Sequence, residues 1–102
     1  MTVYIDPPTW PGHGRVWSHL VSDRSYDELH GFARRLGAPE RAFDRDHYDI
    51  PAASYEAAVR LGAVQVGSKE LVRRLTAAGL RRRKPRPPGP RPAPGVPAEP
   101  GR

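Results

Sequence analysis

The chain has 102 residues, which fits one domain and no more. It contains no cysteine, so disulfide frameworks and thiolate sites are excluded. No apolar run approaches the roughly 18 residues of a membrane span, and the N-terminus lacks a basic region followed by an apolar stretch. We therefore expect a cytoplasmic protein with no membrane partner.

The net charge of +6 comes from one end of the chain. Residues 1–80 contain ten basic and ten acidic residues, whereas residues 81–102 contain seven basic residues and one acidic residue. Residues 81–102 also contain eight of the thirteen prolines. This composition predicts one folded domain over residues 1–80 and a disordered Arg/Pro-rich tail over residues 81–102. Two interpretations of the tail stay open, compositional drift in a GC-rich genome and salt-sensitive contact with nucleic acid.

The first half of the chain predicts two strands and one helix. Residues 2–5 are apolar and end at an Asp-Pro-Pro sequence, and proline cannot continue a strand ladder. Residues 6–15 contain three prolines and two glycines, which is typical of a loop. Residues 16–22 alternate as a second strand. A helix then begins at Ser25, in an S-x-x-E capping box, and ends at Gly37.

The second half predicts two further strands and two helices. After a connection over residues 38–45, a third strand covers residues 46–50 and ends at a proline. A helix follows to about residue 61, and residues 63–66 form a short fourth strand. Ser68 is expected to cap the last helix.

Strands that alternate with helices favour an α/β fold. We expect a small, mostly parallel sheet of about four strands with three helices, in the order β-β-α-β-α-β-α. Ligands bind beyond the carboxyl ends of the strands in such sheets. Asp6, Asp23 and Asp49 lie at or beside three of the expected strand ends. The pattern therefore predicts that acidic residues and histidines meet in one hollow.

Five residues are candidates for catalysis or metal binding. Asp6 and Asp23, at adjacent strand ends, would suit Mg²⁺ or Mn²⁺, although a turn and a helix cap explain them as well. His19 lies within a strand, where a buried structural histidine is the simpler interpretation. His47 and Asp49 form an H-x-D pair on one strand face and can share a metal or orient an imidazole.

Three further residues are candidates for ligand binding. His13 and Arg15 lie in the glycine-containing loop with Trp10, which can close over an anionic ligand or be a plain surface loop. His30 borders the apolar stripe of the first helix and points to the strand ends if that helix crosses the sheet.

The run GRVWSHLVSDRSYDELHGFARRLG, followed by AFDRDHYDIP and LGAVQV, resembles a small bacterial and phage family catalogued as domain of unknown function 4031. The resemblance covers roughly residues 2–75 and implies a compact single domain without an assigned activity. Members often carry a second acid where this chain has Pro7, so paired carboxylates are not available there. The positions that the resemblance highlights are Asp6, His19, Asp23, His30, His47, Tyr48 and Asp49.

We consider three functional hypotheses. The first is a metal-assisted hydrolase or nuclease-like site for phosphate esters, with Mg²⁺ or Mn²⁺ held by Asp6, Asp23 and His47. Its substrate would be a nucleic acid or a phosphorylated small molecule. The second is a non-catalytic accessory module whose basic tail contacts nucleic acid. The third is a buried hydrogen-bond network that only specifies the fold.

Overall fold

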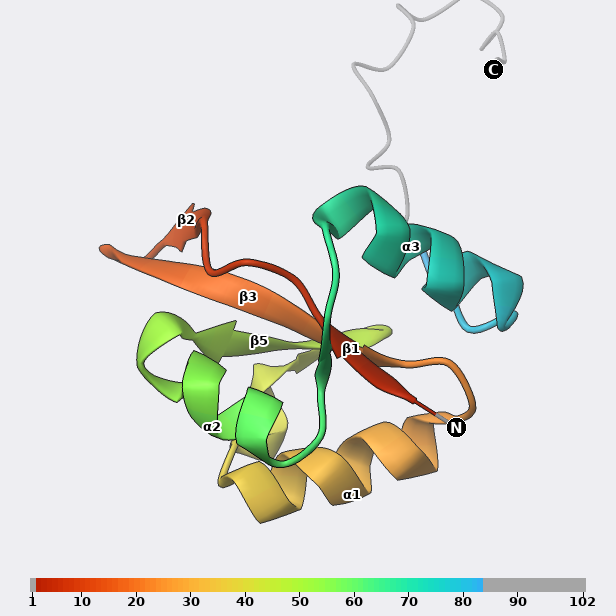
Figure 1. Cartoon of the computed structure of the whole chain (residues 1–102), viewed down its shortest axis with the longest axis horizontal. Helices are drawn as coiled ribbons and strands as arrows, with labels where there is room; N and C mark the ends of the chain where they lie inside the picture. Colours follow the sequence, from red (N-terminus) through yellow and green to blue (C-terminus); the bar gives the residue numbers. More distant parts are fainter. Residues whose placement is uncertain (1, 84–102) are drawn as a thin grey trace, which may run out of the picture.

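The computed structural model describes residues 2–83 (Figure 1). Within this range it contains six strands, three α-helices and two short 3₁₀ helices. The strands form one sheet in the order β4-β5-β3-β1-β6, and β2 also pairs with β3. The elements in chain order are β1 (Val3–Ile5), β2 (Trp10–Gly12), β3 (Arg15–Ser22), α1 (Tyr26–Leu36), η1 (Glu40–Ala42), β4 (Phe43–Asp44), β5 (His47–Pro51), η2 (Ala52–Ser54), α2 (Tyr55–Arg60), β6 (Val64–Gln65) and α3 (Ser68–Ala77).

The sheet is mostly antiparallel, which corrects the expected parallel sheet of four strands. Among the described residues only β1 and β6 pair in parallel. A parallel pair needs a crossover of a dozen or more residues, and residues 6–15 are too few. The chain instead turns back at His13 and Gly14, whose φ angles of 49° and 72° suit a tight hairpin. The mixed α/β class and the three helices are confirmed.

The strand β3 organises the sheet because both of its edges are paired. Along one edge it pairs with β1 and then with β2, and the chain leaves the sheet between Asp6 and Thr9. Along the other edge it pairs with β5, where His19 lies opposite Asp49. Two strands that the sequence did not predict, β2 and β4, extend this arrangement at its margins.

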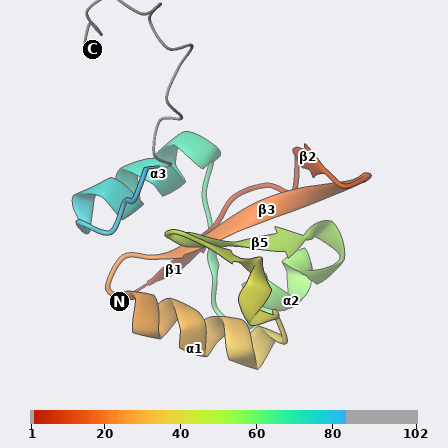
Figure 2. The same cartoon turned by 180° about the vertical axis from the view of Figure 1, so that it is seen from behind.

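The helices cover the two faces of the sheet unequally (Figures 1 and 2). On the face covered by α1 and α2, Leu20 and Ile50 belong to the larger buried core. On the opposite face, which we call the α3 face, α3 packs Leu71 and Leu75 against Val21 at one end of the sheet. Among the helices of residues 2–83, none lies over the rest of the α3 face, and this open part carries the polar cluster described below (Figure 1).

The helices α1 and α3 begin with different kinds of N-cap residue. Ser25 caps α1 as expected, because its hydroxyl accepts a hydrogen bond from the Glu28 N–H at 3.0 Å. The expected cap at Ser68 is wrong, since Gly67 is the N-cap and Ser68 is the first helical residue. The Ser68 hydroxyl donates instead to Asp6 at 2.8 Å.

The chain beyond α3 is described as far as residue 83. Arg81 and Arg82 contact the buried Asp46, so the first residues of the expected tail lie against the folded domain. The rest of that tail, and the nucleic-acid contact expected of it, fall on residues outside those described. Over residues 2–83, no helix has the length and apolar character required to cross a membrane.

Candidate metal centre

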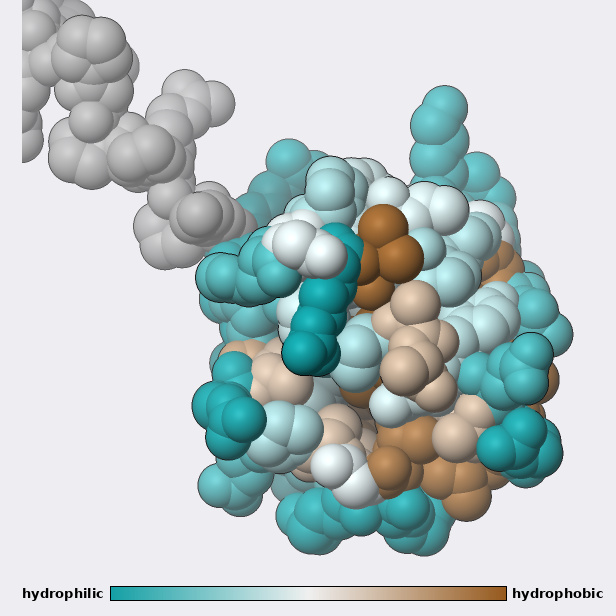
Figure 3. Space-filling model, turned by 90° about the vertical axis from the view of Figure 1, so that its left-hand side faces the viewer, coloured by the Kyte–Doolittle hydropathy of each residue, from teal (hydrophilic) through white to brown (hydrophobic). Residues whose placement is uncertain are grey.

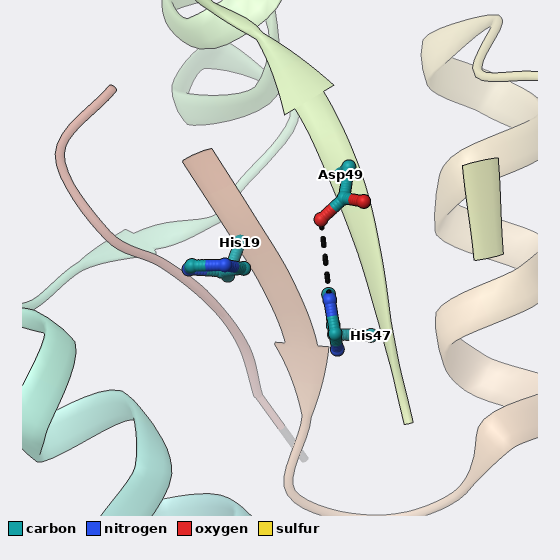
Figure 4. A group of neighbouring side chains, drawn as sticks. All are labelled: His19, His47 and Asp49. Atoms are coloured by element: carbon teal, nitrogen blue, oxygen red, sulfur yellow. Dashed lines mark ion pairs between the residues drawn. The ribbon is translucent and has the colours of Figure 1, made fainter. Parts of the chain in front are cut away.

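Two histidines and one aspartate meet on the open part of the α3 face (Figure 4). His19 comes from β3, and His47 and Asp49 come from β5. His19 and Asp49 are cross-strand partners, and His47 is two residues before Asp49 and therefore on the same face. One donor atom from each of the three residues lies within 4.8 Å of the others. The His47 Nε2 and the Asp49 Oδ1 are 3.2 Å apart.

Asp6 holds His19 in place. The Asp6 Oδ2 lies 2.8 Å from the His19 Nδ1, and the Oδ1 accepts the His19 backbone N–H at 2.6 Å. The Oδ2 also accepts the Trp10 indole N–H at 3.1 Å and the Ser68 hydroxyl at 2.8 Å. Asp6 is fully buried. The break in pairing between β1 and β2 thus places a carboxylate behind the imidazole.

Asp46 holds His47 in the same manner. The Asp46 Oδ1 lies 2.8 Å from the His47 Nδ1. Its Oδ2 accepts the Arg82 backbone N–H at 2.8 Å and the Arg81 guanidinium at 3.2 Å. Asp46 is also fully buried, in the tight turn from β4 to β5 at which Arg45 has a φ of 61°.

Both carboxylates fix the tautomer of their histidine. An ionised carboxylate only accepts hydrogen bonds, so the Nδ1 of His19 and of His47 carries the proton that each donates. In each neutral ring this leaves the Nε2 as the atom with a free lone pair. Carboxylate–histidine pairs of this kind orient metal-binding imidazoles and raise their basicity.

Hydrogen bonds shift the pKa values of Asp6, Asp46 and His47. Burial alone would raise the pKa of Asp6, but hydrogen bonds from His19 and Ser68 outweigh it and lower that pKa. Burial of Asp46 is likewise outweighed by hydrogen bonds from His47 and the Arg82 N–H, which lower its pKa. Burial would lower the pKa of His47, but hydrogen bonds to Asp49 and Asp46 raise it. The two buried aspartates are therefore charged at neutral pH.

The exposed fraction of the side chains increases from the two supporting aspartates to the three clustered residues. The side chains of Asp6 and Asp46 are 0% exposed, that of His47 is 12%, that of His19 is 25% and that of Asp49 is 42% exposed. His19 and Asp49 line a groove of about 740 Å³ that also passes the β2–β3 hairpin. A ligand that enters this groove can therefore reach His19 and Asp49.

This donor set suits a transition metal better than Mg²⁺. Imidazole nitrogens favour Zn²⁺, Fe²⁺, Co²⁺ or Mn²⁺, whereas Mg²⁺ prefers oxygen ligands. Metal–donor bonds of about 2.1 Å place neighbouring donors about 3–3.5 Å apart. The 3.2 Å separation of the His47 and Asp49 atoms already meets this condition. With three protein ligands, a metal keeps open positions for water and substrate.

The structure separates some residues that the sequence analysis grouped. Asp23 does not meet Asp6, because antiparallel pairing puts the end of β3 beside the start of β1. The Asp23 carboxylate accepts the Thr2 N–H at 2.8 Å and the Tyr4 hydroxyl at 3.1 Å. The predicted proximity of Asp6 and Asp23 is therefore wrong, since it depended on parallel strands. Asp6 supports His19 and is not among the three clustered donors.

The other candidates have different positions. His30 does not reach the cluster: its Nδ1 lies 2.7 Å from the hydroxyl of Tyr48, a core residue on the α1/α2 face. His13 and Arg15, which the sequence suggested as ligand-binding residues, line the same groove as His19 and Asp49.

Sequence reasoning missed Asp46, Ser68 and the two arginines after α3. One signal was present, because Asp46 directly precedes His47 in the sequence RDHYD, so the histidine has an acid on both sides. No signal pointed to Ser68 or Arg81, since these side chains reach Asp6 and Asp46 only through the packing of α3 on the sheet.

Comparison with known proteins gives one match. A family model described as "Protein of unknown function (DUF4031)" matches residues 3–78. No curated protein and no solved structure matches the chain.

Proposed function

Because this chain belongs to the DUF4031 family, a family of unknown function, we propose a function from the site itself. His19, His47 and Asp49 bind a divalent transition metal, and the protein uses it to hydrolyse phosphate esters. This proposal replaces the metal ligand set Asp6, Asp23 and His47 with the three residues that lie together.

One observation carries the proposal. Each of the two clustered histidines has a fully buried aspartate at its Nδ1, at 2.8 Å in both cases. Burying a carboxylate is costly unless hydrogen bonds compensate it. Two such carboxylates, each orienting one of two neighbouring imidazoles on an open surface, are typical of metal centres. A purely structural network has no need to gather two such histidines with a third donor, Asp49, beside a groove.

The metal and the residues around it have separate roles in the proposed hydrolysis. When bound, the metal supplies Lewis acidity and lowers the pKa of a bound water to about 7. Asp6 and Asp46 keep the protons on the Nδ1 atoms, and Asp49 supplies the anionic ligand. In the reaction, a hydroxide oxygen bonds to phosphorus and the bond from phosphorus to the ester oxygen breaks. The departing oxygen keeps the electron pair and takes a proton from water.

Charge along the groove supports an anionic substrate. The groove is lined by Arg15 and Arg41, and among residues 2–83 Asp49 is the one acidic residue of its lining. Since Asp49 would be neutralised by the metal, the groove then has an excess of positive charge. Guanidinium groups bind phosphate oxygens in a bidentate manner.

Calorimetric titration of the metal-free protein with Zn²⁺ and Mg²⁺ tests the metal site. We expect Zn²⁺ to bind far more tightly than Mg²⁺, because two of the ligands are imidazoles. His19→Ala and His47→Ala should each weaken Zn²⁺ binding by more than the roughly 10–100-fold typical of a lost supporting residue. Hydrolysis of bis(p-nitrophenyl) phosphate by the metal-loaded protein tests the reaction.

The matched control is His30→Gln, which removes another imidazole, on the α1/α2 face, and keeps a hydrogen-bonding group for Tyr48. It should bind Zn²⁺ like the unchanged protein. Equal Zn²⁺ affinity in His19→Ala and His30→Gln, or no binding at millimolar metal, would contradict the metal site. Tight Zn²⁺ binding without hydrolysis of any phosphate ester would contradict the hydrolase only.

A further inference from the structure

The exposed indole of Trp10 is held in one orientation beside the proposed metal centre. Its N–H donates to Asp6 at 3.1 Å and lies 3.3 Å from the Ser68 hydroxyl. The ring centroid is 5.0 Å from that of His19, in an edge-to-face arrangement. Even so, 45% of the Trp10 surface is exposed. A large apolar side chain that is both fixed and exposed is a typical recognition surface.

A second tryptophan continues this surface. Trp17 is the cross-strand partner of Trp10, so both indoles lie on the same face of the β2–β3 hairpin. The Trp17 N–H donates to the Gly12 carbonyl at 2.8 Å. Both tryptophans line the groove that contains His19 and Asp49.

The rest of the groove combines cations with an apolar wall. Arg15 and Arg41 line it, and no ion pair is found for either within residues 2–83. Leu36, Pro39 and Pro51 contribute apolar surface. Figure 3 shows the side of the molecule toward which the hairpin projects, where apolar (brown) residues gather between hydrophilic (teal) ones. The groove thus offers flat aromatic, cationic and metal-binding groups together.

We infer that the groove binds a nucleotide, with the base stacked on Trp10 and the phosphate paired with Arg15, in the same groove that His19 and Asp49 line. A planar base matches an indole surface, and base stacking on aromatic side chains does not depend on the base sequence. A simple sugar phosphate would pair with the arginines but would have no planar group to stack on the Trp10 indole. The inference rests on the proposed function, because it names the class of phosphate ester.

Binding to the metal-free protein in the presence of a chelator tests the inference without the metal. Calorimetry would compare adenosine 5′-monophosphate with adenosine and with ribose 5-phosphate. We expect the nucleotide to bind more tightly than either fragment. Trp10→Leu and Arg15→Gln should each weaken its binding about tenfold, the usual effect of a lost stacking partner or a lost charged hydrogen bond.

Two variants serve as controls. Trp10→Phe keeps an aromatic ring and should retain most of the affinity that Trp10→Leu loses. Arg60→Gln removes an exposed arginine of α2, whose ion pair with Glu56 is 4.0 Å long, and should leave binding unchanged. Circular dichroism of each variant separates loss of binding from loss of folding.

The source of the nucleotide is decided by a further titration with a short single-stranded oligonucleotide. Tighter binding than the mononucleotide indicates nucleic acid, and equal binding indicates a free nucleotide. Equal affinity for ribose 5-phosphate and the nucleotide, or no effect of Trp10→Leu, would overturn the inference. Because no metal is present, this result is independent of whether the proposed metal site and hydrolysis are correct.

Discussion

Asp6 shows how one residue can be essential to a site without touching its ligand. Its two oxygens serve four donors, from Trp10, Ser68 and the backbone and side chain of His19. An ionised carboxylate has enough lone pairs for all four, and the hydrogen bonds lower its pKa against the effect of burial. The residue is therefore a positioning residue, which sets both the tautomer and the direction of the His19 ring.

Replacing this carboxylate by an amide should affect metal binding and stability together. In Asp6→Asn one acceptor oxygen replaces two, so at least one buried donor loses its partner. We expect Zn²⁺ affinity to fall about 10–100-fold and the free energy of unfolding to fall by about 1–3 kcal/mol. Calorimetry and urea unfolding would measure the two effects.

The matched control is Asp23→Asn, directly after the end of β3, where the carboxylate accepts hydrogen bonds from the Thr2 N–H and the Tyr4 hydroxyl. It should lower stability and leave Zn²⁺ affinity unchanged. If instead Asp23→Asn weakened Zn²⁺ binding as much as Asp6→Asn, the assignment of roles to these two aspartates would be wrong.

At the scale of elements, the segment that follows α3 donates hydrogen bonds to one of the aspartates that support the site. After α3 the chain passes Tyr26, whose ring lies 4.2 Å from the Arg82 guanidinium carbon. There the Arg82 N–H and the Arg81 side chain complete the hydrogen bonds of Asp46. A short irregular segment thus supports the aspartate that orients His47.

A pair of substitutions at one position isolates this backbone hydrogen bond. Arg82→Pro removes the N–H that Asp46 accepts, whereas Arg82→Ala keeps it and removes only the guanidinium. We expect Arg82→Pro to be less stable than Arg82→Ala by about 1–3 kcal/mol, because a buried carboxylate oxygen loses a donor. Urea unfolding curves would measure this difference, and equal midpoints for the two variants would refute it.

The elements were more predictable from sequence than their arrangement. The start of α1 at Ser25, its end at Gly37 and the β5 strand follow from capping residues and apolar spacing. The hairpin was missed because Trp-Pro-Gly resembles a loop, although it pairs with β3 as a strand. Helix and strand signals are local, whereas strand direction depends on the connections between strands.

The site was also predictable only in part, because local sequence signals do not give strand direction or register. The pairing of His47 with Asp49 follows from alternation along one strand. The meeting of His19 with Asp49 requires the register of β3 on β5, which the sequence does not encode locally. The wrong grouping of Asp6 with Asp23 shows how an error in strand direction moves a residue to the opposite end of the neighbouring strand, here β1.

At the scale of the whole molecule, two aspartates and one histidine make the stability of the fold depend on pH in opposite directions. Asp6 and Asp46 have lowered pKa values, so their stabilisation is present above the unfolded pKa of about 3.9 and is lost as the pH falls through the folded values. His47 has a raised pKa, so its stabilisation is present below about 6.5 and is lost as the pH rises through the folded value.

The metal-free protein should therefore be most stable between about pH 4 and pH 6.5. Adding Zn²⁺ should extend this range upward, because a metal binds the deprotonated Nε2 of His47. Urea unfolding across the pH range, with and without metal, would measure both effects. A free energy of unfolding that keeps rising from mildly acidic to alkaline pH in the metal-free protein would contradict the assigned pKa shifts.

The support of both histidines by late segments of the chain has a consequence for protein synthesis. Every proposed metal ligand is translated by residue 49, but Asp6 and Asp46 obtain some of their donors only from Ser68, Arg81 and Arg82. A nascent chain on the ribosome thus carries all its ligands long before their carboxylate supports are complete. A premature stop codon just before Arg81 would leave the ligands intact and remove the hydrogen bonds that Asp46 accepts from Arg81 and Arg82.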